Sequence, residues 1–303
     1  TSFAFDIVKS DDLTINMNGD IDLLIKNSSK KDGSDSDLEI ETNFDDIDFD
    51  FKWKIDDSLT FIAATDWTTE SDDDNVVYND QSWAGFTYNN FMMRAGFQED
   101  AIDPLGIDTF EIESIGRASG EQDGSGTKFA ESIVVGYDHD DFKLLASYAM
   151  ASEGSSYTDD DNDAVYKADS EVVDRLALYA KTKVGDFQIE AGIGQESDID
   201  DTATVNFWQA QVEYFTGPFT LAALYSSMSV DQTDSSATDY DSTGLEFNVN
   251  YEVNDKLDVY VGYETIDNGV SGTDNYVGMG IGASYAFSKL VKLYVEAGTE
   301  EGS

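Results

Sequence analysis

The sequence predicts an all-β protein, a transmembrane antiparallel β-barrel, and three observations lead to this fold class. The first is that apolar and polar residues alternate along most of the chain. Between Ile47 and Ile55, every odd position is apolar and every even position is charged. A period of two residues gives a strand one apolar and one polar face. The alternating segments are about nine or ten residues long, which is the length that a tilted strand needs to cross a bilayer.

The second observation is that the connections between these segments alternate in length. Short turns occur at residues 56–58, 139–141 and 184–186, and each is followed by an apolar residue that begins a strand. Long, acidic connections lie between them, such as residues 68–80 and 151–174. Short turns on one side and long loops on the other are typical of bacterial outer-membrane barrels.

The third observation is the absence of any long apolar run, together with a low proline content of two residues. A membrane-spanning helix needs about 18 to 20 consecutive apolar residues. If this chain spans a membrane, it therefore does so as a closed barrel, because only helices and barrels satisfy their backbone groups in lipid. The scarcity of proline suits long strands, since proline removes a donor from the strand ladder.

The strand count predicts a sixteen-stranded barrel. We count about fifteen strands, the first starting near Leu13 and the last near Leu290. Single-chain bacterial barrels have an even number of strands, so we expect a final strand beyond Ser303. The alternative is that one hairpin is merged or split in this count.

The first residues have a separate interpretation. Ser2, Phe3 and Ala4 resemble the small-x-small end of a signal peptide. Residues 1–4 are therefore a possible signal-peptide remnant, with an ordinary frayed terminus as the alternative. We expect residues 5–303 to form a single transmembrane barrel domain.

The composition excludes several classes of protein. With 63 acidic and 17 basic residues, the formal charge is −46, and such a field repels nucleic acids. Aromatic residues make up 13% of the chain, which argues against disorder. No cysteine is present for a disulfide, a thiolate metal site or a nucleophile. The one histidine, His139, lies in a short acidic turn without a nucleophile beside it, so we expect no enzyme.

Several stretches, taken in order, are similar to one family. Residues 7–15 (IVKSDDLTI) look like a first strand after a short charged turn, and residues 83–88 (WAGFTY) and 91–97 (FMMRAGF) look like the fourth and fifth strands. Residues 101–108 (AIDPLGID) resemble the start of a third loop. In this order the chain, from about residue 7 to residue 297, resembles the sixteen-stranded general porins of Gram-negative bacteria.

The resemblance implies a homotrimer in the outer membrane, with a water-filled channel that a long, inward-folded third loop constricts. That loop would span about residues 98–130, and we expect residues from about 99 to 119 to lie inside the barrel. The resemblance also implies a pore constriction in which Arg94 on the wall faces Asp108, Glu111 and Glu113 on the loop. The proline-containing stretch of the family's loop is replaced here by EIESIG, so that half of the loop departs from the pattern.

The alternation assigns charged residues to the wet face of the barrel. These pore-lumen residues are Asp46, Asp48, Asp50, Lys52, Lys54 and Arg175, together with Asp66, Lys143, Lys181, Lys183, Glu190, Glu213, Glu246 and Glu264. The simplest role for any one of them is to keep the lumen hydrated. Asp46 and Asp50 stand where enteric members of the family carry bases, which weakens the basic side of the pore.

Metal binding is expected only in the long loops. Asp159, Asp161 and Asp163 have the alternate-acid start of a calcium loop. The glycine expected at position six is Ala164 and the glutamate expected at position twelve is Ser170, so this is not an EF-hand. We expect no resident cofactor. Loosely bound Ca²⁺ or Mg²⁺ at the outer loops would ease their repulsion from lipopolysaccharide.

The expected function is passive diffusion of small hydrophilic solutes and ions, with a preference for cations. The expected partners are outer-membrane lipid, lipopolysaccharide, the solutes themselves and two further copies of the chain. One alternative is a substrate-specific porin for sugars or peptides, which needs an aromatic path along the lumen, whereas lumen aromatics here are scattered. Another alternative is a secreted, acidic, calcium-dependent adhesin, which would be soluble without detergent.

Overall fold

The computed structural model describes most of the chain, as two compact units. The described residues are 2–20, 22–27, 38–69, 77–107, 128–150, 157–158, 164–166, 173–198, 203–232, 239–269, 275–289 and 291–301. Unit 1 comprises Thr1–Asn89 with Ser288–Lys292, and unit 2 comprises Asn90–Phe287 with Leu293–Ser303. Among the described residues, no helix has the length and apolarity that a membrane-spanning helix requires.

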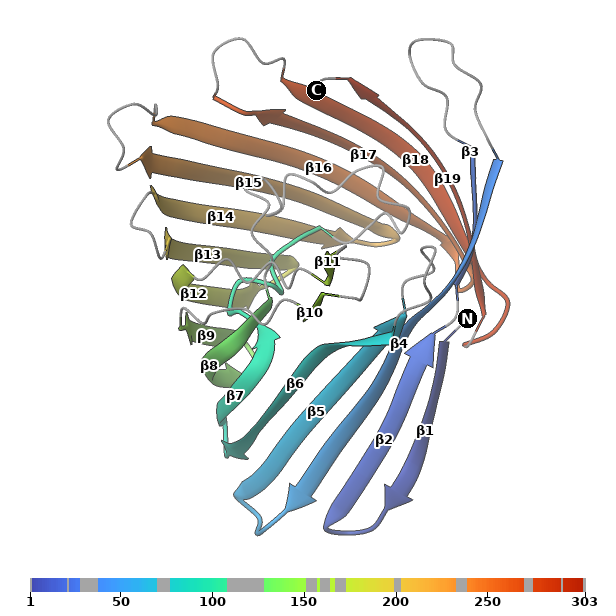
Figure 1. The fold of residues 1–303 in the computed structure, drawn as a ribbon. Helices are drawn as coiled ribbons and strands as arrows, with labels where there is room; N and C mark the ends of the chain where they lie inside the picture. Colours follow the sequence, from blue (N-terminus) through green and yellow to red (C-terminus); the bar gives the residue numbers. More distant parts are fainter. Residues whose placement is uncertain are drawn as a thin grey trace. The chain divides into compact units, whose positions relative to one another are not determined.

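Unit 1 is an antiparallel meander (Figure 1). Its strands are β1 (Ser2–Lys9), β2 (Leu13–Asp20), β3 (Asp22–Asn27), β4 (Leu38–Lys54), β5 (Leu59–Thr69) and β6 (Val77–Tyr88). β1 pairs with β2, and β4 pairs with β2, β3 and β5, while β5 also pairs with β6. The predicted strand from Asp46 therefore begins earlier, at Leu38.

Unit 2 holds the remaining strands, most of which pair with their neighbours in the chain. They are β7 (Phe91–Glu99), β8 (Lys128–His139), β9 (Phe142–Ala149), β12 (Val173–Val184), β13 (Phe187–Asp198), β14 (Ala203–Thr216), β15 (Phe219–Gln232), β16 (Tyr240–Asn254), β17 (Leu257–Asp267), β18 (Tyr276–Ala286) and β19 (Lys292–Glu301). An unbroken antiparallel series of pairings runs from β7 to β18. β10 (Tyr157–Thr158) and β11 (Ala164–Tyr166) form a separate short ladder.

The strand number confirms the sixteen that we expected, but the count of fifteen in this chain is wrong. Of the nineteen strands in the described residues, β10 and β11 stand apart, and β2 and β3 both pair with β4 and count as one, which leaves sixteen. The omitted strand is β1. The register of β1 against β2 shifts between Asp6 and Val8. A bulge at this point leaves Ile7 as an extra residue and interrupts the alternation of the two faces. An odd number therefore no longer argues for a strand beyond Ser303.

The start of the chain takes part in this pairing. Ser2, Phe3 and Ala4 are paired with Asp20, Gly19 and Asn18 of β2. The interpretation of residues 1–4 as a signal-peptide remnant remains a prediction.

The two faces of the sheet in unit 2 differ as the alternation predicts. On β12, Leu176 and Leu178 are 51% and 45% exposed, whereas Arg175, Ala177 and Tyr179, which alternate with them, are buried. The same alternation recurs on the other strands, with the outer face carrying exposed Ile, Leu, Val and aromatic side chains. A contiguous apolar face of this size is rare on soluble monomers, and it suits contact with hydrocarbon. The opposite face, which we call the polar face, carries the charged and amide side chains.

Aromatic pairs of the outer face lie at the strand ends beside short turns. The rings of Phe187 and Tyr214 are 4.6 Å apart, and those of Phe219 and Tyr251 are 4.7 Å apart, measured between centroids. Aromatic rings at strand ends are typical of the membrane–water interface.

A short turn joins β12 and β13 where the sequence predicts one. The predicted long connections at residues 68–80 and 151–174 lie mostly outside the described residues. β12 and β13 are joined by Gly185 and Asp186 alone, because Val184 pairs with Phe187. Gly185 has a φ of +62°, which is the left-handed region that a two-residue hairpin turn needs and that glycine adopts without strain.

We expect Gly185→Ala to lower the free energy of unfolding by about 1–2 kcal/mol through backbone strain alone. A Cβ at this position would meet no atom within 4 Å, so a clash contributes nothing. The measurement is urea unfolding in detergent micelles, with Asp186→Ala in the same turn as the control. Equal stability of the two variants would contradict the assignment of strain to Gly185.

Candidate functional site

The connection between β7 and β8 begins by folding onto the polar face of unit 2. Within residues 100–107, which we call the inward segment, Ala101, Ile102, Leu105 and Ile107 are buried. They share one apolar cluster with Leu145 on β9, Ala177 and Tyr179 on β12, and Ala222 and Leu224 on β15. The prediction that this connection starts inside is confirmed for the inward segment. The predicted remainder, residues 108–127, lies outside the described residues.

A glycine on the wall leaves room for this packing. A Cβ on Gly192 of β13 would lie 2.8 Å from Cγ1 of Ile102 and 3.4 Å from Cδ1 of Leu105. The backbone of the inward segment can therefore approach the wall more closely here than a larger residue would allow.

A buried ion-pair network holds the inward segment to the wall. Arg175 Nε lies 2.7 Å from Asp100 Oδ2, and Arg175 Nη1 lies 3.0 Å from Glu196 Oε2. The guanidinium carbon also lies 4.4 Å from the ring centroid of Phe207. Arg175 and Asp100 are only 5% and 1% exposed. A planar guanidinium with several donors in fixed directions can pair with two carboxylates at once, which suits a buried network.

Asp100 in turn shapes the inward segment. Its Oδ1 accepts hydrogen bonds from the backbone NH groups of Ile102, at 2.8 Å, and Asp103, at 3.1 Å. The NH of Ala101 donates to Ser147 Oγ of β9 at 2.9 Å. Burial raises the pKa of the Asp100 carboxyl, while the charge of Arg175 and these two NH donors act in the opposite direction. One carboxylate thus both fixes the turn and ties it to β12.

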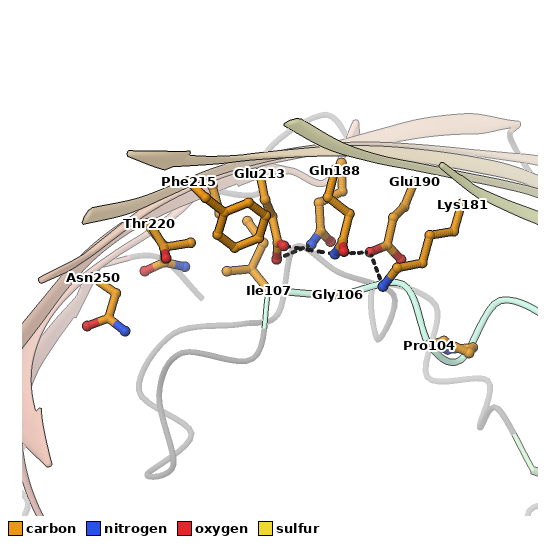
Figure 2. A pocket seen from close by; sticks show the side chains of 13 residues that line it. Pro104, Gly106, Ile107, Lys181, Gln188, Glu190, Glu213, Phe215, Thr220 and Asn250 are labelled. Carbon is orange, nitrogen blue, oxygen red and sulfur yellow. Dashed lines mark hydrogen bonds and ion pairs between the residues drawn. The ribbon is translucent and has the colours of Figure 1, made fainter. Parts of the chain in front are cut away.

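A pocket of about 330 Å³ lies between the inward segment and β12–β16. Figure 2 shows Pro104, Gly106 and Ile107 of the segment facing side chains of the strands. Two adjacent rows of the sheet supply most of the wall. One row runs from Lys181 through Glu190 to Gln211, and the next runs from Gln188 through Glu213 and Ala222 to Asn248. Phe215, Thr220 and Asn250 follow in the third row.

Hydrogen bonds connect the polar side chains of this wall. Lys181 Nζ pairs with Glu190 Oε1 at 3.0 Å. Gln188 Nε2 donates to Glu190 at 2.7 Å and to Glu213 at 2.8 Å, and the Tyr179 hydroxyl also donates to Glu190. The pocket therefore carries two carboxyl groups and one ammonium group, all held in place by neighbours. It offers fixed charge and hydrogen-bond groups to a passing solute.

The predicted constriction residues are only partly described. Arg94 lies half-buried on β7, and among the described residues the carboxylates of Glu99 and Asp103 are near enough for their charge to act on it. Asp108, Glu111 and Glu113, which we expected to face Arg94, lie outside the described residues. Asp103, on the inward segment, is thus an acidic neighbour of Arg94 that the sequence did not single out.

The structure places Arg175 on the polar face, as predicted, but Arg175 does not line an open lumen there. It is buried under the inward segment and paired with two carboxylates. Asp100 and Glu196 were missed as its partners. The Asp-x-x-Asp spacing of residues 100–103 is the only sequence feature that could have indicated the turn that Asp100 caps.

The predicted lumen residues of unit 1 lie on β4 and, for Asp66, on β5. Asp48 is paired with Asp66 of β5 in the sheet register, and Asp50 Oδ2 accepts a hydrogen bond of 3.2 Å from Asn18. Lys52 is exposed on the same parity, and Lys54 is paired with Asp57 at 2.8 Å in the following turn. Asp46 lies within β4.

The described residues contain no group of three or more acidic or histidine side chains that could hold a metal ion. The weak calcium candidates Asp159, Asp161 and Asp163 lie outside the part of the chain that the structure describes.

Comparison with known proteins now assigns the class. The model of the Gram-negative porin family matches residues 6–303. The fold is similar to a loop-deletion mutant of the outer-membrane protein OmpT of Vibrio cholerae, at 20% identity and a TM-score of 0.78, over 97% of this chain and 95% of that one. It is similar to the trimer form of OmpT, at 19% identity and a TM-score of 0.77, over 96% and 90%.

A third similar structure is the anion-selective porin from Comamonas acidovorans, at 14% identity and a TM-score of 0.72, over 100% of this chain and 90% of that one. No curated protein sequence matches the chain. The fold and the polar face together define an outer-membrane β-barrel channel. The chain belongs to the Gram-negative porin family.

We expect Arg175→Met to lower the free energy of unfolding by about 3 kcal/mol, because it leaves two buried carboxylates without their cation. The inward segment should also become a site of proteolytic cleavage. Urea unfolding and limited proteolysis in detergent measure the two effects. Lys183→Met, on the same strand and face but exposed, is the matched control. If both variants lose equal stability, Arg175 is not the anchor.

Proposed function

We propose that this porin passes small hydrophilic solutes and ions by passive diffusion and prefers cations. The observation that carries the proposal is the composition of the polar face beside the inward segment. Glu190 and Glu213 line the pocket there, against the single ammonium of Lys181, which is itself paired with Glu190. Arg175, the other base of β12 near the segment, is neutralised by Asp100 and Glu196.

Unit 1 supports the same preference. Asp48, Asp50 and Asp66 are acids of the lumen parity on β4 and β5, and the base Lys52 accompanies them. The whole chain carries a charge of −46. A negative potential along a pore raises the local concentration of cations and speeds their entry. The fold alone does not decide this, since a porin with a similar fold is anion-selective.

A substrate-specific porin for sugars or peptides is less well supported. Tyr179 and Tyr260, two of the aromatic residues on the lumen parity, are buried rather than displayed to a solute, and each hydroxyl donates to a glutamate. The proposal also assigns no catalytic activity. His139 is the last residue of β8, and its ring stacks with that of Phe142 at 5.5 Å between centroids.

The proposed assembly is a homotrimer in contact with outer-membrane lipid and lipopolysaccharide. The trimer form of a protein with a similar fold supports the trimer, and the exposed apolar outer face supports contact with lipid. Binding of Ca²⁺ or Mg²⁺ by the acidic long loops is the proposed bridge to lipopolysaccharide. The oligomeric state in mild detergent tests the first part.

Planar-bilayer recording in a potassium chloride gradient tests the selectivity. We expect a reversal potential of cationic sign in dilute salt that fades in concentrated salt. The Debye length is about 10 Å at 0.1 M and about 3 Å at 1 M. At the higher concentration, fixed charges therefore act on ions only close to the wall of the pore.

The same recording with variants locates the responsible charges. Glu213→Gln and Asp50→Asn should each reduce the cation preference, because each removes a carboxylate from the polar face. Asp186→Asn, in a short turn outside this face, should leave it unchanged. A reversal potential near zero or of anionic sign for the wild type in dilute salt would refute the proposal.

A further inference from the structure

The part of the wall beneath the inward segment is built from small residues. Ala177 of β12 lies opposite Ser147 of β9 on one side and Gly194 of β13 on the other. Gly192 lies in the next row of the same face. We call these four residues the seat. The polar face is lowest there, because the neighbouring side chains in the adjoining register positions are larger, namely Leu145, Arg175, Tyr179 and Phe207.

The inward segment lies directly on the seat. A Cβ on Gly192 would lie 2.8 Å from Cγ1 and 3.1 Å from Cδ1 of Ile102, and 3.4 Å from Cδ1 of Leu105. Ile102 and Leu105 are both buried. The backbone NH of Ala101 donates to Ser147 Oγ at 2.9 Å. An apolar contact at Gly192 and a hydrogen bond at Ser147 thus hold the segment against the wall.

The inward segment is stiff around Ile102. Asp100 Oδ1 accepts hydrogen bonds from the NH groups of Ile102 and Asp103, at 2.8 and 3.1 Å. The NH of Leu105 donates to the carbonyl oxygen of Ile102 at 2.7 Å. Pro104 restricts the backbone between them, since its ring fixes φ. The Ile102 side chain is branched at Cβ and has few rotamers. A group placed beneath Ile102 therefore displaces the segment more readily than it bends it.

A second glycine of the seat supports the ion pair that holds the segment. A Cβ on Gly194 would lie 2.2 Å from Cζ of Phe207, so the Phe207 ring lies across Gly194. The guanidinium carbon of Arg175 lies 4.4 Å from the centroid of this ring. Arg175 in turn pairs with Asp100 at the start of the segment. Both glycines of β13 thus let the segment and its anchor lie close to the wall.

We propose that Gly192 is a positioning residue of the channel, because the lack of a side chain there sets how close the inward segment lies to the wall. The polar face borders the lumen, so a segment that stands farther from this wall narrows the passage for solutes. With a Cβ on Gly192, Ile102 Cγ1 would have to move by about 1 Å, from 2.8 Å to an ordinary carbon–carbon separation of about 3.5–4.0 Å. This inference rests on the proposed function and adds a residue that determines the largest solute admitted.

Permeation of uncharged sugars into proteoliposomes tests the inference, because uncharged probes do not respond to the fixed charge of the channel. The probes, in order of size, are arabinose, glucose and sucrose. We expect Gly192→Ala to lower the rate for sucrose by a larger factor than the rate for arabinose, and Gly192→Val to widen that difference. Ala191→Val is the matched control. Ala191 is the preceding residue of β13 and is exposed on the outer face, so this variant should leave the ratio of rates unchanged.

A second substitution separates positioning from a loss of stability. Ile102→Ala removes the two atoms that a Cβ on Gly192 would meet at 2.8 and 3.1 Å. In an Ile102→Ala background, Gly192→Ala should therefore no longer change the ratio of the sucrose rate to the arabinose rate. An effect of Gly192→Ala through stability alone would persist in that background, since the truncation of Ile102 leaves a cavity and weakens the packing further.

The possible results separate this inference from the proposed function. An unchanged ratio of rates in folded Gly192→Ala, or a loss that persists with Ile102→Ala, would overturn the positioning role and leave passive diffusion standing. Wild-type protein that admits none of the three sugars would refute the proposed function and this inference with it. Urea unfolding in detergent shows whether each variant is folded. If Gly192→Val does not fold, Gly192→Ala with and without Ile102→Ala still decides.

Discussion

The buried contact between Arg175 and Asp100 is the interaction on which the arrangement of the candidate site depends. A connection of this length has no conformational reason to fold back onto a hydrated wall, because ordering it costs backbone entropy. Four interactions together offset that cost. They are the ion pair of Arg175 with Asp100 at 2.7 Å, the second pair with Glu196, the turn that Asp100 caps, and the apolar cluster of Ile102 and Leu105. The wall of β12–β16 and the inward segment then enclose a pocket instead of an open surface.

The same wall shows how a barrel can separate structural from functional charge. Arg175 is a charged residue of the polar face, but it serves the fold, since both of its carboxylate partners are buried with it. Lys181, Glu190 and Glu213 lie on the same face nearer the short turns, and they border the pocket. On the proposed function, this second group contributes more than Arg175 to the field that a solute meets. We therefore expect the charges that are not neutralised locally to contribute most to the selectivity.

Much of the fold could be predicted because a strand's two faces have a period of two residues. That rule correctly placed Glu190, Glu213 and Glu246 opposite the exposed apolar residues, and it failed at β1, where the bulge near Ile7 breaks the period. The role of Arg175 could not be predicted in this way, because its partner Asp100 lies 75 positions away.

We propose that the inward segment borders the path of ions and that this path prefers cations. The chain has no cysteine, so Pro104→Cys, in the pocket lining, introduces a unique thiol there. The most direct measurement is the rate at which a cationic and an anionic methanethiosulfonate reagent each reduce the current of this variant in a planar bilayer. The account predicts that both reagents reduce the current and that the cationic one reacts faster in dilute salt. A current that neither reagent alters, or faster reaction with the anionic reagent, would contradict it.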